Sequence, residues 1–221
     1  MRKPIRMLVG GGVLAAALLG TSMPAQAHAG APSPVVIGAG HVDVVDVEYE
    51  DGELELGLHD ESVDPGVERD PSEVVLLAKR QARTTVPADP AFSFLGPAGA
   101  PVWILPEIQN EDLLWPGLST EELESGVFAD DTVTLTATRV TGPGRVAVYT
   151  EDAVGAPHVL INSGDGLPDA VPLTTGGHQH ASWAFQRAGV HRITFQASAL
   201  LADGGAVVTS EPTTYTFAVQ R

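Results

Sequence analysis

Alternating apolar and polar residues dominate the chain, and this period of two predicts β-strands rather than amphipathic helices. Leu54, Leu56 and Leu58 alternate with charged or small residues, so one face of their strand is predicted to be buried. The dipeptide Asp51-Gly52 just before them is a strong hairpin-turn signal. The pattern therefore predicts a β-hairpin whose leucine-bearing face packs into the hydrophobic core of the protein.

The strand before this hairpin, Val42 to Tyr49, also alternates, but its phase slips once near Val45. Further short segments of β character follow, separated by turns rich in Gly and Pro: 74–78, 102–105, 132–140, 145–150, 159–162, 178–185, 190–199, 207–209 and 214–219. Together they predict an all-β fold, a single β-sandwich of immunoglobulin-like or jelly-roll type with about ten short strands.

One short helix is predicted among these strands. Ser119 and Glu122 have the spacing of a capping box, and Gly126 is a suitable helix end. The Gly- and Pro-rich segments 84–100 and 164–177 are predicted to be loops.

The N-terminus has the pattern of a sorting signal. Arg2, Lys3 and Arg6 precede an apolar run over 7–19, and Ala25-Gln26-Ala27 has the form of a cleavage site. We therefore expect a signal peptide over 1–27, a flexible lead-in over 28–40 and a β-sandwich domain over 41–221. The apolar run is too short to cross a membrane, so we predict a secreted protein without a membrane span in the mature chain.

Charge and composition narrow the possible partners. The formal net charge is −16, and loss of three basic residues with segment 1–27 would make it 9 − 28 = −19. Such a chain is a poor ligand for nucleic acid, which needs clustered Lys and Arg. The chain has no Cys, so disulfides and thiolate metal sites are excluded.

The histidines are the strongest candidates for chemistry. Alternation places His178 and His180 on one face of a strand, while Trp183 and Phe185 occupy the opposite face. The His-x-His pair spans about 7 Å between Cα atoms, so both imidazoles can reach one metal ion. Two surface histidines on a strand also occur by chance, so a third ligand is needed. His191 shares a face with apolar residues and is predicted to be a packed core histidine, paired with Phe185 if the two strands are neighbours.

A third ligand is offered by the first strand. His41 and Asp43 lie two residues apart on one face, which is a suitable pair for Zn²⁺ or another divalent transition metal. His59 ends the following strand and is a further candidate, with Asp43 as the alternative fourth ligand. The alternative interpretation of Asp43 is a solvated carboxylate on an outward strand face, and that of His59 is a polar residue at the end of a strand.

Several of these segments, in order, make the chain resemble the actinobacterial surface-anchored domain called the choice-of-anchor M domain. They are Gly40-His41-Val42-Asp43-Val44, Tyr49-Glu50-Asp51-Gly52, the segment from Phe94 to Pro106, Leu114-Trp115-Pro116-Gly117, Gly142-Pro143-Gly144 and the segment from His178 to Phe185. The resemblance covers about residues 40–220. It implies a secreted or wall-attached protein associated with an ABC transporter for metal uptake.

The chain departs from the family at its end. Members commonly carry a C-terminal sorting motif or membrane helix, and the segment from Phe217 to Arg221 shows neither. We therefore expect a form that is released or held by a partner.

Three classes of function follow. The first is an extracellular protein that binds a divalent metal, with zinc expected, for an ABC-type uptake system. Its partner would be the solute-binding component of that system or the cell wall. The second is a non-catalytic structural or adhesive surface module. The third, a metal-dependent wall hydrolase, is disfavoured because no general base stands out, so no enzyme activity is predicted. Convergence of His41 with His178 and His180 would favour the first class, and their placement on distant edges the second.

Overall fold

The computed structural model describes residues 33–221, and these form one compact β-rich unit. The predicted signal peptide lies outside the described residues. Within them the chain is an all-β sandwich, as the alternation predicted, with seventeen strands and four short 3-10 helices. The higher strand count arises because several predicted loops contain short strands of their own.

Three sheets make up the fold, and each contains strands that are distant in sequence. Sheet A has the order β1 (Val35–Ile37), β5 (Val74–Ala78), β17 (Thr213–Val219), β15 (Gly189–Leu200), β9 (Thr132–Thr141) and β12 (Asp169–Thr174), with β16 (Val207–Thr209) paired to β15. Sheet B has the order β13 (His178–His180), β8 (Leu114–Ser119), β2 (Gly40–Glu50), β3 (Glu53–Asp60) and β4 (Val67–Arg69). Sheet C has the order β11 (Pro157–Asn162), β10 (Val146–Glu151), β14 (Ser182–Phe185), β7 (Pro101–Leu105) and β6 (Arg83–Thr85). The 3-10 helices are η1 (Pro71–Glu73), η2 (Arg80–Ala82), η3 (Pro90–Leu95) and η4 (Ala129–Asp131).

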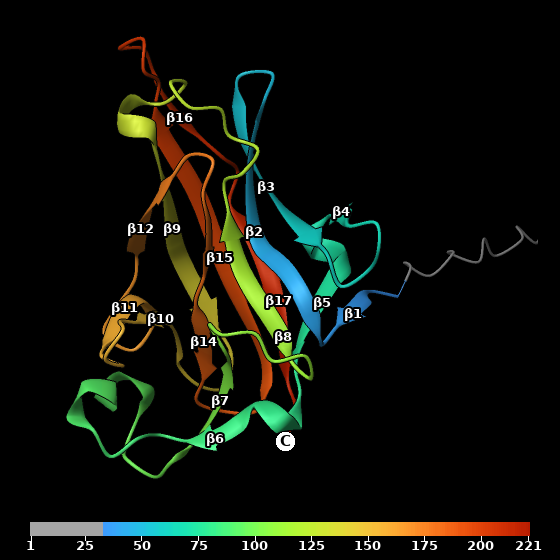
Figure 1. The fold of residues 1–221 in the computed structure, drawn as a ribbon, viewed down its shortest axis with the longest axis vertical. Coiled ribbons are helices and arrows are strands. Elements are labelled where there is room, and N and C mark those ends of the chain that lie inside the picture. Colours follow the sequence, from blue (N-terminus) through green and yellow to red (C-terminus); the bar gives the residue numbers. More distant parts are fainter. Residues whose placement is uncertain (1–32) are drawn as a thin grey trace, which may run out of the picture. The chain divides into compact units, whose positions relative to one another are not determined.

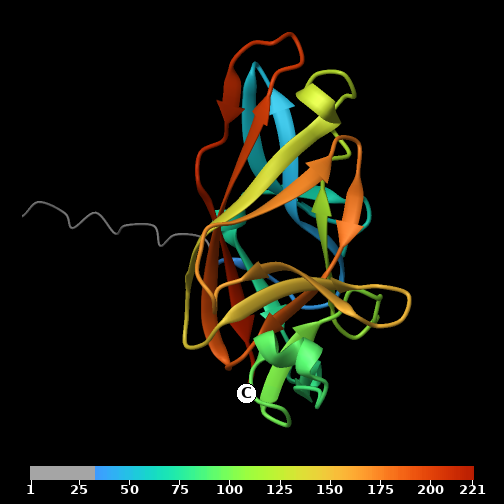
Figure 2. The same ribbon diagram turned by 90° about the vertical axis from the view of Figure 1, so that its left-hand side faces the viewer.

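Sheet A forms one layer of the sandwich, and sheets B and C together form the other. In Figure 1 the strands β9, β15 and β17 run behind β2, β3 and β8, and Figure 2 gives the same layers from the side. Trp183 of sheet C stacks on Phe217 of sheet A with ring centroids 5.3 Å apart. The Tyr215 hydroxyl of sheet A donates a 2.9 Å hydrogen bond to the Gly57 carbonyl of sheet B. The core therefore lies between the layers, and the opposite face of sheet B is free to carry polar groups.

The predicted strand over 178–185 is two strands in different sheets. β13 pairs with β8 in sheet B, and after Ala181 the chain continues as β14 in sheet C. The predicted alternation nevertheless holds, because Trp183 and Phe185 are fully buried while His178 and His180 are at least partly exposed. The break lets one continuous segment join the two sheets of this layer.

The phase slip near Val45 is a β-bulge. Asp43 pairs with His59 and Asp46 pairs with Gly57, so β2 advances three residues while β3 advances two. A bulge inserts an extra residue and shifts the side chains after it to the other face. Here it brings Asp43 and Asp46, which plain alternation would separate, onto the same outer face of sheet B.

The predicted helix after Ser119 is absent, and that prediction is wrong. Ser119 ends β8 instead, paired on one side with Asp46 and on the other with His178. The residues after it form turns, and the Thr120 hydroxyl donates to the Thr174 carbonyl at 2.6 Å. Pairing within the sheet thus overrides a local capping signal.

Three further expectations are corrected by the strand pairing. β1 lies within the predicted flexible lead-in 28–40 but pairs in parallel with β5. β12 lies within the predicted loop 164–177 and pairs with β9. His191 is a buried core residue as predicted, but its cross-strand partner is Phe217, and Phe185 meets it from the opposite sheet. The segment 84–100, which was predicted to be a loop, contains the end of β6 and the 3-10 helix η3.

Candidate metal centre

Three of the histidines predicted to bind a metal lie on β2 and β13, the two strands that flank β8 in sheet B. His180 on β13 faces Gly117 on β8, and Gly117 faces Asp43 on β2. His41 lies two residues before Asp43 on the same face, and His178 two residues before His180. Gly117 has no side chain, so the groups from the flanking strands can meet above it. The sheet thereby brings together residues that are 137 positions apart in the chain.

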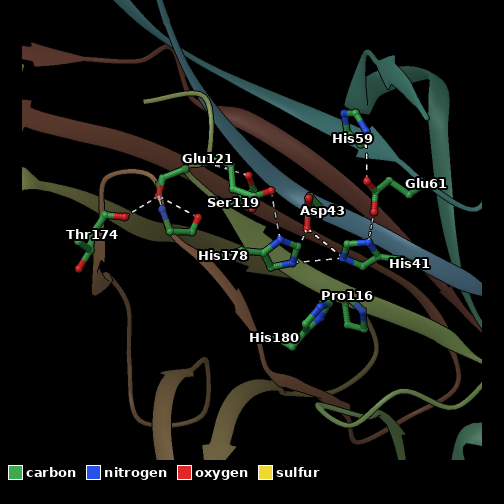
Figure 3. Close-up of polar contacts among 12 residues, drawn as sticks. His41, Asp43, His59, Glu61, Pro116, Ser119, Glu121, Thr174, His178 and His180 are labelled. Atoms are coloured by element: carbon green, nitrogen blue, oxygen red, sulfur yellow. Dashed lines mark hydrogen bonds and ion pairs between the residues drawn. The ribbon is translucent and has the colours of Figure 1, made fainter. Parts of the chain in front are cut away.

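Three polar atoms converge at this point with nearly equal spacing (Figure 3). The Nε2 atoms of His41 and His178 are 3.2 Å apart. Asp43 Oδ1 lies 3.1 Å from His178 Nε2 and 3.4 Å from His41 Nε2. A tetrahedral zinc ion with bonds of about 2.0–2.1 Å separates its ligands by about 3.3–3.4 Å. The triangle therefore has the size of one face of such a coordination shell.

The third imidazole completes the group. Ligand atoms of His41, His178 and His180 all lie within 4.8 Å of one another. The ring of His180 is 4.9 Å from that of His41 and 4.8 Å from that of His178, centroid to centroid. Trp115 lies flat against His180, with ring centroids 3.6 Å apart and planes 7° apart, so the imidazole is held in place.

Each of the three imidazoles has its Nδ1 atom engaged by an acceptor outside the centre. His41 Nδ1 contacts the Glu61 carboxylate, and His178 Nδ1 lies 3.4 Å from Glu121 Oε2. His180 Nδ1 lies 3.0 Å from the Pro116 carbonyl oxygen. A carbonyl or carboxylate only accepts, so each Nδ1 carries the proton and donates it. Each Nε2 is then left with a free lone pair, which is how outer partners orient metal-bound histidines.

The electrostatics of the centre call for a cation. Asp43 Oδ1 is fully buried and receives no hydrogen bond of good geometry, although two imidazole nitrogens lie within 3.4 Å. With both Nδ1 atoms protonated, the two Nε2 atoms and this oxygen are all acceptors. Acceptors packed this closely repel one another unless a proton or a metal ion lies between them.

The shifts in pKa reflect this conflict. The nearby Asp43 carboxylate raises the pKa of His41, burial opposes this effect, and Glu61 adds to it. Burial lowers the pKa of His180, and the neighbouring His178 and His41 lower it further. The two imidazoles therefore differ in their affinity for a proton.

His59, the remaining predicted ligand, belongs to a different group. It gathers with Asp46 and Glu68, and its Nδ1 contacts the Glu68 carboxylate. Its link to the centre is indirect, through Glu61, whose Oε1 lies 3.8 Å from His59 Nε2. Of the two residues predicted as a possible fourth ligand, Asp43 lies beside His41 and His178, and His59 lies in the other group.

Sequence reasoning missed the residues that support the ligands. These residues are Glu61, Glu121 and Trp115. They meet their histidine partners only through the folding of the sheet, and a single sequence carries no signal for which strands pair. Gly117 carried a usable signal, because a glycine inside a strand often marks a close approach of other groups. A Cβ at that position would overlap Asp43 Oδ1 and would stand 2.9 Å from His178 Nε2.

The helices of the described residues are all short 3-10 helices. Among residues 33–221, no helix is long and apolar enough to cross a membrane.

Comparison with known proteins adds no further assignment. No protein-family model matches the chain, and no curated protein matches it as a relative.

Proposed function

We propose that this protein binds a divalent transition metal, zinc by preference, through His41, His178 and His180 with Asp43 as the fourth ligand. The observation that carries the proposal is the triangle of acceptor atoms with edges of 3.1–3.4 Å, whose spacing fits a tetrahedral zinc ion. The convergence of His41 with the His-x-His pair also favours metal binding over the structural module.

The donor set supports zinc among the common divalent ions. Imidazole nitrogens suit zinc, copper and nickel, whereas magnesium and calcium prefer oxygen ligands. One carboxylate among three imidazoles neutralises half of the charge of a divalent ion.

The number of donors favours binding over catalysis. Catalytic zinc sites keep one position open for water or substrate, whereas four protein donors fill a tetrahedral shell. The side chains of His41 and His178 are 17% and 22% exposed, so an ion can enter from solvent at the outer face of sheet B. A filled but accessible shell suits reversible capture.

The wider role is an extension of this proposal. The signal-like N-terminus supports secretion, and the resemblance to the choice-of-anchor M domain supports service to an ABC-type metal uptake system. We propose accordingly that the protein captures zinc outside the cell and presents it to such a system or to a partner at the cell surface.

The test is the zinc stoichiometry and affinity of the purified, tagless protein, measured beside the variant His178→Ala/His180→Ala. His158→Ala is the matched control, because it removes an exposed imidazole on β11, in another sheet. We expect the double variant to lose one high-affinity equivalent and the control to retain it. Equal zinc affinity in all three proteins would refute the proposal.

A second measurement separates capture from a purely structural zinc. Removal of the ion with a chelator should leave the far-ultraviolet circular dichroism spectrum unchanged and should be reversed on adding zinc. Unfolding on chelation would indicate a structural ion instead.

A further inference from the structure

A second group of ligand-type side chains lies on the same face of sheet B, on the other side of β2. Asp46 on β2, His59 on β3 and Glu68 on β4 offer atoms that all lie within 4.8 Å of one another. His59 pairs with Glu68 across the strands, and Asp46 pairs with Gly57, two residues before His59. Three consecutive strands therefore each contribute one donor.

Asp46 is the feature that sets this group apart from an ordinary acidic surface. The residue is 3% exposed, and its Oδ1 atom is buried without a hydrogen-bond partner. A buried carboxylate oxygen without a partner is costly, because it has lost water and gained nothing in exchange. The bulge in β2 turns this carboxylate toward His59 and Glu68 rather than into the core.

Space for an ion is provided by Gly57. A Cβ at this position would stand 3.6 Å from Glu48 Oε1 and 3.8 Å from Glu68 Oε2. The glycine therefore leaves open the position between two carboxylates and beside Asp46. The arrangement repeats that of the first centre, where Gly117 lies beneath the converging ligands.

From these observations we infer that Asp46, His59 and Glu68 form a second divalent-cation site. Its donors are two carboxylates and one imidazole, a harder set than that of the histidine centre. Carboxylate oxygens favour Mn²⁺, and the single imidazole keeps the site suited to a first-row transition ion. The inference rests on its own residues and does not depend on the histidine centre.

The two sites are separate but connected. Gly117 and Gly57 lie on the strands flanking β2 and are offset by two residues, which places them about 12 Å apart. This exceeds the separation of about 4 Å in a binuclear centre, so each site holds its own ion. Glu61 contacts His41 Nδ1 with one oxygen and lies 3.8 Å from His59 Nε2 with the other, so it supports ligands of both sites (Figure 3).

The experiment isolates the second site by disabling the first. Mn²⁺ binding is measured by electron paramagnetic resonance in the full chain carrying His178→Ala/His180→Ala. Glu68→Gln and Asp46→Asn are then added singly to this background. Glu53→Gln is the matched control, because it removes one charge from the same face of β3 outside the group. Thermal unfolding of every variant confirms the fold.

We expect the background protein to bind about one equivalent of Mn²⁺. Either added variant should raise the Mn²⁺ dissociation constant at least tenfold, and the control should leave that constant unchanged. Absence of Mn²⁺ binding in the background protein, or Mn²⁺ affinity in Glu68→Gln and Asp46→Asn that equals that of the background protein, overturns the second site. Should Asp46→Asn fail to fold, Glu68→Gln decides alone, since the Glu68 side chain is 54% exposed. Failure of the histidine centre would show only in the zinc titration, so the two proposals fail independently.

Discussion

A methyl group at Gly117 is the most incisive test of the histidine centre, because it alters no ligand. In Gly117→Ala the new Cβ would overlap Asp43 Oδ1 and would stand 2.9 Å from His178 Nε2. Gly117 has no positive φ, so alanine suits its backbone. The expected defect is therefore confined to the space where the ligands meet.

The magnitude follows from these distances. Carbon and nitrogen atoms in ordinary contact are about 3.5 Å apart, so His178 must retreat by roughly 0.5 Å and Asp43 by more. Metal–ligand distances tolerate only about 0.2 Å, so a displacement of this size loosens or removes two of the four bonds. We expect zinc affinity to fall at least 100-fold, or about 2.7 kcal/mol.

The assay is competition with a chromophoric zinc chelator at fixed pH. Gly57→Ala is the matched control, because its Cβ would make only ordinary contacts of 3.6 Å and 3.8 Å on the same face of the sheet. We expect the control to bind zinc at the histidine centre like the wild type. Wild-type affinity in a folded Gly117→Ala protein would show that the ion does not lie above Gly117, and the proposed coordination would be wrong.

Three other predictions concern stability, each measured by urea unfolding. Tyr215→Phe removes the 2.9 Å hydrogen bond to the Gly57 carbonyl and should cost about 1–2 kcal/mol; an unchanged midpoint would argue against that bond. Arg69→Leu takes the 2.7 Å ion-pair partner from the buried Asp60 carboxylate and should cost about 2 kcal/mol, whereas a stabilised variant would contradict this. Burial lowers the pKa of His191 in the folded protein. The buried neutral imidazole therefore contributes its full stability above a pH of about 6.5, and this contribution is lost as the pH falls toward the folded-state pKa. In that range the free energy of unfolding should change by up to about 1.4 kcal/mol per pH unit. His191→Gln should flatten that slope, and an identical slope would assign the acid sensitivity elsewhere.

Local alternation was sufficient to predict the fold class and the orientation of individual side chains. It identified the buried face of β3, the phase slip near Val45 and the outward direction of His178 and His180. These features follow from the period of two, which depends only on backbone geometry within one strand. The same reasoning paired His41 with Asp43, and the two lie 3.4 Å apart.

Local signals failed where pairing between strands competed with them. The capping box at Ser119 predicted a helix, but Ser119 is held between Asp46 and His178 in sheet B. His59 was expected to join His41, and its imidazole lies instead with Asp46 and Glu68.

The composition of the candidate sites was decided by the tertiary structure. Sequence patterns nominated ligands on separate strands, but the order β13, β8, β2, β3 and β4 determines which of them meet. His41 and His178 become neighbours across 137 residues because β8 pairs with both of their strands. Side-chain direction is a property of each strand alone, whereas strand order depends on how all the apolar faces of the chain are buried together.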